Sequence, residues 1–339
     1  MPIRDHIITL VRGSDLTQAH AAEAMDEIMG GVATPAQIAA FLTALHLKGE
    51  TDAEIAGMAE VMRAKSLHVA HDGPVLDTCG TGGDASGTFN ISTTAAFVAA
   101  GAGATVAKHG NRAASSVCGS ADVLEGLGVN IELDGAGVAR CLREAGIGFM
   151  FAQKFHPAMR YVGPVRREIG IRTVFNVLGP LTNPARARHQ VIGVPNNQIA
   201  EKLAHALARL DTAHALVVCG DGGLDELALS GPNQVLEVRG SDVRRLDPII
   251  AGELGLERAP REAVLGGTVA ENVAITRAVL RGEERGPRRD IVLLNAAAAL
   301  LAADRAADMR EGIAQARHAL DSGAALARLD AMVAASQTQ

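Results

Sequence analysis

The sequence predicts an α/β protein: a small all-helical N-terminal domain followed by a large α/β domain, whose mainly parallel central sheet is flanked by helices. Two observations predict this class. Residues 1–70 carry helix start signals in series and no alternating apolar pattern. Residues 71–339 alternate short β-type runs with helical ones, which favours parallel strands joined by crossover helices. A chain of 339 residues is long enough for these two unequal domains.

The composition excludes several classes of partner. The formal charge is −6, and Lys and Arg are interleaved with Asp and Glu, so we expect neither a nucleic acid nor a membrane as partner. A small-molecule ligand is the better expectation. The four cysteines form no C-x-x-C pair, and the first residues carry too short an apolar run for a signal peptide. We therefore expect a cytoplasmic protein with reduced thiols.

Three segments near the N-terminus predict helix starts. "DLTQ" (15–18), "TPAQ" (34–37) and "TDAE" (51–54) each place a capping residue three positions before Glu or Gln. Pro35 lies where its missing N–H costs nothing. Three or four short helices are expected, and residues 68–75 are the predicted junction to the second domain.

Three later segments predict strands that end in unusual loops. "VLDTC" (75–79) precedes a glycine loop and a helix with Ser92 or Thr93 near its N-cap. "TVAKHG" (105–110) precedes a Gly/Ser-rich loop and a helix that begins near residue 120, and "HALVVCG" (214–220) ends at "DGGLDE". Because ligands of open α/β sheets bind at the carboxyl ends of strands, we expect the three loops to form one site.

The remainder of the chain predicts mostly helix. Residues 266–283 have a helical pattern, and residues 290–303 are expected to be helical or part strand. The charged run "RGEERGPRRD" (281–290) is expected to be a solvated loop.

The loop "GTGGDASGTFN" (80–90) predicts an anion site. Glycine permits positive φ and a close approach of backbone N–H groups to a ligand. A loop that also opens a helix favours phosphate or pyrophosphate, although a tight turn without a ligand is the alternative. The spacing fits neither the Walker pattern nor the dinucleotide fingerprint, so a ligand other than ATP or NAD is indicated.

The second loop, "KHGNRAASS" (108–116), suits a second phosphate group. Lys108 supplies a point charge, and the hydroxyl and amide groups supply hydrogen bonds. The alternatives are that Lys108 is a surface lysine and Asn111 a turn residue.

The third loop supplies the opposite charge. Asp225 and Glu226 are adjacent carboxylates, and a polyphosphate site has little use for them unless Mg²⁺ bridges the two. The Ser92 hydroxyl could complete the metal's shell. The alternative is an acid pair that starts a helix. A transition-metal site is not expected, because the histidines and cysteines show no ligand spacing.

Four long segments, in this order along the chain, resemble the motifs of anthranilate phosphoribosyltransferases, which catalyse a step of tryptophan biosynthesis: residues 77–93, 108–122, 156–185 and 221–232. The resemblance covers essentially the whole chain. It implies a reaction between 5-phosphoribosyl-1-pyrophosphate and anthranilate with Mg²⁺, and a homodimer that associates through the helical parts. It also implies that residues 165–188 complete the helical domain.

The resemblance further implies roles for individual residues. Those that would bind the phosphoribosyl donor are Gly80, Gly83, Asp84, Thr88, Asn90, Ile91, Ser92, Thr93, Lys108, His109, Gly110, Asn111, Arg112, Ala113, Ala114, Ser115, Ser116 and Ser120. Those that would bind anthranilate are Gly80, Asn111 and Arg166, with His109 and His156 near its entry path. Those that would hold Mg²⁺ are Ser92, Asp225 and Glu226.

The attack of the amine needs no strong base to begin, and we assign no general base. An aromatic amine is neutral at pH 7 and already carries a free lone pair. Two other functions stay open at the level of the sequence. One is a pyrimidine nucleoside phosphorylase, whose own signature is absent. The other is a noncatalytic paralogue that binds nucleic acid, for which a basic groove and degraded motifs would be expected.

Overall fold

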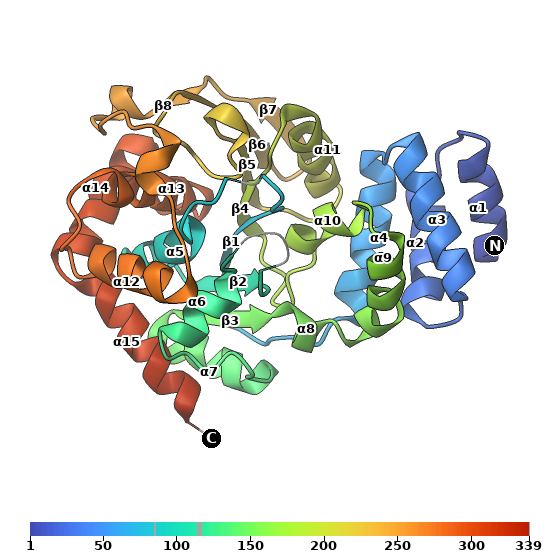
Figure 1. Cartoon of the computed structure of the whole chain (residues 1–339), viewed down its shortest axis with the longest axis horizontal. Coiled ribbons are helices and arrows are strands. Elements are labelled where there is room, and N and C mark those ends of the chain that lie inside the picture. The colour runs from blue at the N-terminus through green and yellow to red at the C-terminus, as the bar shows by residue number, and fades with distance from the viewer. Residues whose placement is uncertain (85, 114–116, 339) are drawn as a thin grey trace.

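The computed structural model describes residues 1–84, 86–113 and 117–338. A small helical body and a larger α/β body lie side by side, with the N-terminus in the first and the C-terminus in the second (Figure 1). Within the described residues, no helix combines the length and apolar character that crossing a membrane requires. The fold class predicted from the sequence is confirmed.

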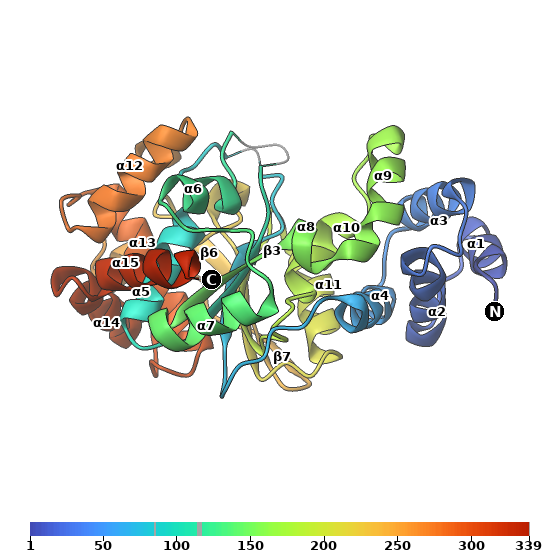
Figure 2. The same ribbon diagram turned by 90° about the horizontal axis from the view of Figure 1, so that it is seen from below.

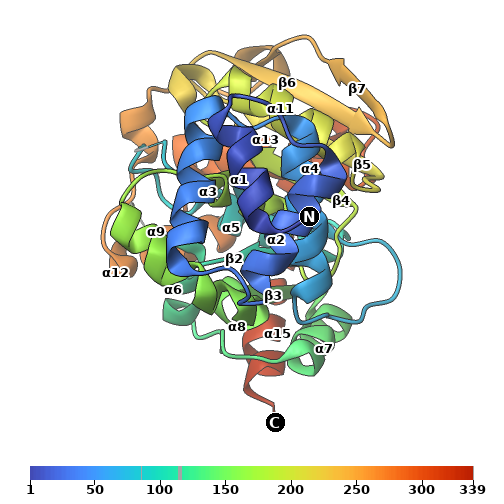
Figure 3. The ribbon, with the colours of Figure 1, turned by 90° about the vertical axis from the view of Figure 1, so that its right-hand side faces the viewer.

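Four helices form the N-terminal body, which faces the viewer in Figure 3. They are α1 (Ile3–Val11), α2 (Gln18–Met29), α3 (Pro35–Lys48) and α4 (Asp52–Lys65). The capping boxes predicted at Thr34 and Thr51 are both present. The third predicted cap is wrong, because the Thr17 side chain caps α2 by accepting from His20 N–H. Asp15 instead accepts a hydrogen bond from Lys48 Nζ at 2.7 Å.

The central sheet has the order β3-β2-β1-β4-β5-β6-β7, and β8 pairs with β6. Its first five strands are parallel, and the pairs β5–β6 and β6–β7 are antiparallel. The strands are β1 (Leu76–Gly80), β2 (Val106–Gly110), β3 (Ile147–Phe151), β4 (His189–Gly193), β5 (His214–Cys219), β6 (Pro232–Arg239), β7 (Asp242–Arg245) and β8 (Ile249–Ile250). The prediction identified β1, β2 and β5 among these.

Helices cover both faces of the sheet (Figure 1). On β5, Leu216 and Val218 belong to the core built with α5 and α13, whereas Ala215 and Val217 belong to the core built with α11. This alternation is the period of two that a strand imposes. The covering helices are α5 (Ile91–Gly101), α6 (Ser120–Gly126), α7 (Gly135–Ala145), α11 (Asn197–Ala208), α12 (Val269–Leu280), α13 (Pro287–Ala302), α14 (Met309–Asp321) and α15 (Ala324–Gln337). Short 3-10 turns occupy Asp221–Gly223, Ala251–Leu254 and Arg261–Val264.

The charged run 281–290 is only partly a loop. Pro287 takes the first position of α13, where its missing N–H is harmless, so the helix begins inside the run. Arg289 is buried and donates to Asp321 at 2.8 Å. Residues 290–302 are helical, without any strand. The expectation of a solvated loop therefore fails for the second half of the run.

Short helices between β3 and β4 connect the two bodies. They are α8 (Ala152–Phe155), α9 (Gly163–Ile169) and α10 (Phe175–Leu178), with 3-10 turns at Pro157–Tyr161 and Gly179–Leu181. Val165, Phe175 and Leu178 share one apolar core with α1–α4. Figure 2 shows α9 standing beside α3. The domain boundaries at residues 70 and 165–188 stay a prediction.

Candidate active site

The carboxyl ends of β1, β2 and β5 open into one cleft of about 540 Å³. All three loops predicted from the sequence contribute to its lining. The predicted residues that line it are Gly80, Gly83, Asp84, Thr88, Asn90, Ile91, Ser92, Thr93, Lys108, His109, Gly110, Asn111, Arg112, Ala113, Ser120, Asp225 and Glu226. Ala114, Ser115 and Ser116 lie outside the described residues. Arg166 and His156 are not part of the described lining.

The glycines at the end of β1 and just after it make room for an acid from the third loop. A Cβ on Gly80 would overlap Asp225 Oδ2 and lie 2.8 Å from Asp225 Cγ. The N–H of Gly82 donates to the same Oδ2 at 2.9 Å. Gly82 and Gly83 have φ of 66° and 79°, which other residues rarely adopt. The glycine loop is thus tied to Asp225 within the protein, while Gly82 has no atom within 4 Å of an added Cβ and faces open space.

The N-cap of the helix after this loop lies two residues before Ser92, the nearer of the two predicted positions. Asn90 is the N-cap of α5, but its side chain makes no cap hydrogen bond and donates instead to the Cys118 carbonyl at 3.2 Å. The backbone N–H of Ser92 donates to Glu226 Oε1 at 3.1 Å. A carboxylate therefore occupies the position at the helix start where an anion is favoured.

Asp225 and Glu226 do not start a helix, so that alternative is wrong. They lie between the 3-10 turn at Asp221–Gly223 and β6. Burial raises the pKa of both carboxyls above their usual values. The neighbouring Asp84 raises the pKa of Asp225 further, and Asp225 does the same for Glu226. A bound cation would reduce the repulsion among these closely spaced carboxylates.

Lys108 is not a surface lysine, because only 3% of it is exposed. Its Nζ donates to the Thr78 carbonyl and lies 3.4 Å from Ser92 Oγ. Its positive charge opposes the rise in the pKa of Glu226, which burial and Asp225 cause. The ammonium therefore sits at the floor of the cleft, beside the acid pair.

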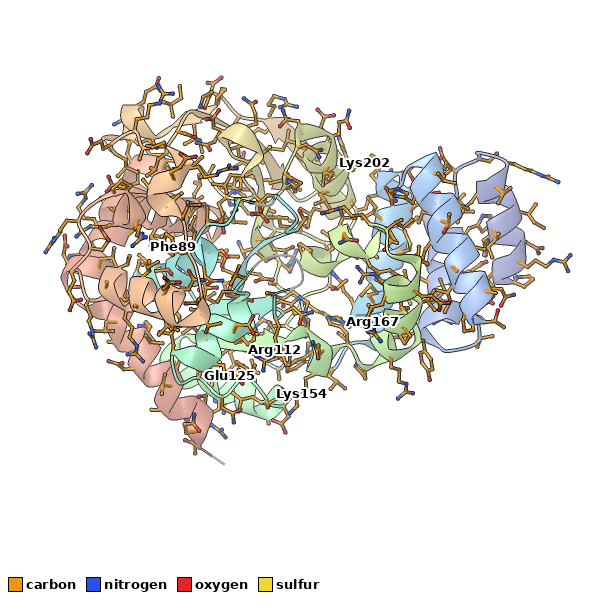
Figure 4. All side chains as sticks on the ribbon, in the orientation of Figure 1. Phe89, Arg112, Glu125, Lys154, Arg167 and Lys202 are labelled. Atoms are coloured by element: carbon orange, nitrogen blue, oxygen red, sulfur yellow. The ribbon has the colours of Figure 1, made fainter. Side chains whose placement is uncertain are left out.

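The second loop is anchored by acids of α6. Arg112 Nη1 lies 3.0 Å from Asp122 Oδ1 and 2.8 Å from Glu125 Oε2, and Figure 4 shows Arg112 and Glu125 together. Asp122 Oδ2 accepts the N–H groups of Ala113 and Gly119 at 3.0 and 2.9 Å. Asn111 is exposed, and its Oδ1 accepts the Arg112 N–H at 2.8 Å. Asn111 thus also has the local hydrogen bond of a turn residue.

The two predicted histidines form a buried pair. His109 Nε2 and His156 Nε2 are 3.2 Å apart, so one ring donates and the other accepts. Burial lowers the pKa of His109 to about 3 and that of His156 to about 4. Both rings are therefore neutral at pH 7. His109 lines the cleft, and His156, which is not in the described lining, contacts it through this hydrogen bond.

Arg166 lies on α9, outside the described lining. Its Nη2 donates to Asn176 Oδ1 at 3.3 Å, and its guanidinium lies 5.3 Å from the centre of the Phe175 ring. Burial lowers its pKa, and its Nε has no partner among the described residues. Asn176, to which it is bound, does line the cleft.

Two residues of the α9–α10 segment were missed. Arg172 and Asn176 both line the cleft. Both lie in the stretch "GIRTVFN" (170–176), inside the third of the four family-like segments, residues 156–185. The arginine and the amide side chain of that stretch were the sequence signal that could have indicated a contribution to the site. No local pattern, however, indicates that the segment folds back onto the loop after β1.

The donor set of the cleft fits a phosphate ligand with a hard cation. Thr81 Oγ1, Asn90 Oδ1 and Thr93 Oγ1 are buried side-chain oxygens that lack a partner among the described residues, and all three residues line the cleft. Within the same part of the chain, no group of three His, Cys, Asp or Glu side chains is placed to hold a metal. Mg²⁺ in proteins commonly takes one or two carboxylates and completes its shell with water and phosphate oxygens.

Comparison with known proteins covers the whole chain. Residues 72–326 match the family described as "Glycosyl transferase family, a/b domain", and residues 4–66 match "Glycosyl transferase family, helical bundle domain". The anthranilate phosphoribosyltransferase of Roseiflexus castenholzii is 74% identical over 336 residues, which are 99% of both chains.

Solved structures agree with this result. The crystal structure of the Thermus thermophilus anthranilate phosphoribosyltransferase aligns with a TM-score of 0.92 at 47% identity, covering 98% of this chain and 100% of that one. The Saccharomyces cerevisiae enzyme in complex with PRPP and Mg aligns with a TM-score of 0.91 at 28% identity, covering 99% and 98%. The same yeast enzyme in complex with 4-fluoroanthranilate aligns with a TM-score of 0.89 at 26% identity, with the same coverage.

Proposed function

The chain belongs to the anthranilate phosphoribosyltransferase family, and from this premise we infer its reaction. It transfers the phosphoribosyl group of 5-phosphoribosyl-1-pyrophosphate to the amine of anthranilate. The products are N-(5-phosphoribosyl)anthranilate and pyrophosphate, in tryptophan biosynthesis. The observation that carries this function is the meeting of the glycine loop, the Lys108 loop and the acid pair at one cleft. A cytoplasmic location is part of the same proposal.

We propose that the donor lies along the cleft between the first two loops. Gly82 and Gly83 line this cleft without side chains of their own, and Thr88, Asn90 and Thr93 add oxygen and amide groups. The second loop, Lys108 through Ser116 together with Ser120, would hold the other phosphate of the donor.

We propose that Asp225 and Glu226 hold Mg²⁺ with the help of Ser92. When bound, the ion would neutralise negative charge on the pyrophosphate. The geometry already links these residues, because Ser92 N–H donates to Glu226 at 3.1 Å and Lys108 Nζ lies 3.4 Å from Ser92 Oγ.

Anthranilate would bind where Gly80, Asn111 and His109 meet the α9–α10 segment. Arg166 would pair with its carboxylate, which requires the guanidinium to exchange Asn176 for the substrate. The neutral His109 offers either a donor or an acceptor without adding charge beside the amine.

The residues act mainly by orientation. The amine lone pair forms the bond to C1′ while the electron pair of the C1′–oxygen bond leaves with pyrophosphate. Positive charge develops on the ribose ring, as in other glycosyl transfers. The proton lost from the amine passes to solvent or to the departing pyrophosphate, and no side chain is assigned to take it. Holding both reactants in line can lower the barrier by about 7–11 kcal/mol.

The proposed function is tested by following anthranilate fluorescence. Anthranilate fluorescence should fall when the purified chain is mixed with anthranilate, 5-phosphoribosyl-1-pyrophosphate and Mg²⁺, because anthranilate is consumed. Omission of the donor should abolish the change. Phosphorolysis of thymidine and uridine serves as the comparison. Turnover of the nucleosides without turnover of anthranilate would favour a nucleoside phosphorylase instead.

The proposed metal site predicts that variants of the acid pair bind Mg²⁺ more weakly. Replacing both Asp225 and Glu226 with Asn and Gln should raise the Mg²⁺ concentration needed for half-maximal rate at least tenfold, because the neutral amides bind a hard cation weakly. Activity titrations with Mg²⁺ measure this. Asp221, which accepts from Ser230 Oγ and does not line the cleft, provides the control Asp221→Asn. An unchanged titration curve in the double variant would contradict the assignment.

The proposed anthranilate site predicts that a variant of Arg166 binds anthranilate more weakly. Arg166→Ala should raise the KM for anthranilate far more than the KM for the donor, because only the acceptor has the carboxylate that this guanidinium would bind. Initial rates at varied concentrations of each substrate separate the two constants. Equal rises in both constants would count against the role of Arg166.

We further propose that the chain is a homodimer that associates through its helical body. Exposed large apolar side chains there include Val11, which is 70% exposed, and Leu47, which is 80% exposed. Sedimentation velocity of the wild-type protein and of Leu47→Glu measures the mass in solution. A monomeric wild-type protein would remove this proposal.

A further inference from the structure

The positive side chains of the cleft are not equally available to a ligand. Three described residues of the lining are cationic: Lys108, Arg112 and Arg172. Lys108 donates to the Thr78 carbonyl, and Arg112 pairs with two acids of α6. Among the described residues, Arg172 has no ion pair and no side-chain hydrogen bond to either body. Arg172 is therefore the cation of the described lining whose hydrogen-bond donors remain for a ligand.

Arg172 lies against the glycine loop. A Cβ on Gly83 would overlap Arg172 Nη1 and lie 2.8 Å from Arg172 Cζ. The guanidinium thus packs on the Cα of Gly83, at a position that only glycine leaves open. Gly83 also has a φ of 79°, which other residues rarely adopt, and both Gly83 and Arg172 line the cleft.

The acid pair lies beside this wall. Asp225 accepts the N–H of Gly82 at 2.9 Å, and Asp84, the residue after Gly83, accepts the N–H of Asp225 at 3.3 Å. A ligand anion that reached the proposed metal site would therefore pass next to Gly83 and Arg172.

The segment that carries Arg172 is held in place by its own contacts. Asn176 Oδ1 accepts the Thr173 N–H at 2.9 Å, which fixes the turn immediately after Arg172. Val174 and Phe175 belong to the core shared with the helical body. Arg172 thus reaches from that body to the glycine loop of the α/β body.

We propose that Arg172 binds the pyrophosphate of the donor and that residue 83 is glycine in order to admit it. This inference rests on the proposed function. When the C1′–oxygen bond breaks, its electron pair stays with pyrophosphate, and negative charge grows on that oxygen. The planar guanidinium donates hydrogen bonds to such oxygens without losing a proton. A donor aimed at developing charge is worth roughly 10²–10³-fold in rate.

The experiment compares Arg172→Gln, Arg172→Lys and the control Arg167→Gln, a neighbouring exposed arginine of α9 (Figure 4). Arg172→Gln should lower kcat/KM for the donor about 10²-fold, raise the inhibition constant of pyrophosphate at least tenfold, and leave the KM for anthranilate within about threefold. Arg172→Lys should retain part of the pyrophosphate binding, because it keeps the charge without the planar fork. Arg167→Gln should match the wild type.

A second variant and a second measurement keep the inference independent of folding and of the assay. Gly83→Ala should reproduce the loss of pyrophosphate binding, with a Tm that shows a folded protein. Calorimetric titration with Mg²⁺-pyrophosphate tests the role of Arg172 without requiring turnover of anthranilate. If pyrophosphate binding depends on Arg172 but anthranilate is not turned over, only the proposed function fails. If Arg172→Gln binds pyrophosphate within twofold of the wild type, or loses anthranilate binding selectively, the inference is overturned.

Discussion

Asp77 lies on β1 with no exposed surface, beneath the cleft. Its Oδ1 accepts the backbone N–H of His109 at 3.0 Å, and its Oδ2 accepts Asn183 Nδ2 at 2.8 Å. Burial raises the pKa of Asp77, and the charge of Lys108 opposes that rise. One buried carboxylate therefore fixes the carboxyl end of β2, from which both His109 and the second loop depart.

The histidine pair predicts a dependence of stability on pH. The pKa values of His109 and His156 are about 3 and about 4 in the fold, below the usual value of about 6.5. Between these values the unfolded chain binds more protons than the folded one, so stability is lost as the pH falls below about 6.5. Each imidazole contributes up to about 1.4 kcal/mol per pH unit. The double variant His109→Gln with His156→Gln should show a smaller decline in unfolding free energy between pH 7 and pH 5.

Urea unfolding at several pH values measures this slope. His318, which is exposed on α14, provides the control His318→Gln, and this variant should keep the wild-type slope. The buried His6 and His214 are unchanged in all three proteins, so the difference between slopes isolates the pair. A double variant with the wild-type slope would show that the pair is already charged in the fold.

At the scale of elements, the packing of α2 on α4 depends on a glycine inside a helix. Gly57 lies in α4, where Ala would ordinarily be more favourable by about 0.5–1 kcal/mol. A Cβ at Gly57 would overlap the Gln18 carbonyl oxygen and lie 3.2 Å from the Ala22 nitrogen. Gly57→Ala should therefore destabilise the protein by about 1–3 kcal/mol, because α2 must move away.

Thermal or urea unfolding measures the effect of Gly57→Ala. The control is Gly252→Ala in a 3-10 turn, where nothing lies within 4 Å of an added Cβ. That variant should be neutral or slightly stabilising. Equal stabilisation by both substitutions would mean that α2 and α4 are not in close contact.

The elements that the sequence predicted correctly are those with local signals. The capping boxes at Thr34 and Thr51 need only residues three apart, and both are present. Thr17 replaced Asp15 as a cap because the Asp15 side chain is held by Lys48, which comes from a later helix. Strand β4 was not predicted, and its place between β1 and β5 depends on pairing between segments that are distant in the sequence.

The candidate site also divides into residues with a local sequence signal and residues placed by contacts between distant segments. The glycine loop, Lys108 and the acid pair can each be recognised from residue types within a few positions of the sequence. The parallel sheet brings them to one edge. That Lys108 faces Thr78 instead of solvent could not be derived from the sequence. Nor could the place of Arg172, because its position depends on how the α9–α10 segment packs between the two bodies.

At the scale of the whole molecule, the two bodies share an apolar core. Side chains of α1–α4, α9, α10 and α11 and one face of β4, β5 and β6 belong to the same cluster. Arg63 of α4 lies within this contact, where its Nε donates to the Leu181 carbonyl at 2.6 Å and its Nη1 donates to the Leu210 carbonyl at 2.9 Å. Burial lowers the pKa of Arg63 to about 10, so the side chain remains charged at pH 7.

This arrangement predicts that Arg63→Ala loosens the helical body from the sheet. Two carbonyls of buried residues would lose their donor, at a cost of about 1–3 kcal/mol each. The control is Arg209→Ala, which breaks an exposed ion pair with Asp52 between the same bodies and should cost less than about 1 kcal/mol.

Two probes of urea unfolding distinguish loosening from a uniform loss of stability. The single tyrosine, Tyr161, packs its ring against Gly31 of the helical body, so its fluorescence reports that contact, whereas far-UV circular dichroism reports all helices. The two transitions should coincide in the wild type, because the bodies share a core. In Arg63→Ala the tyrosine transition should come at lower urea than the dichroism transition. Coincident transitions in Arg63→Ala, shifted together, would mean that the shared core alone couples the bodies.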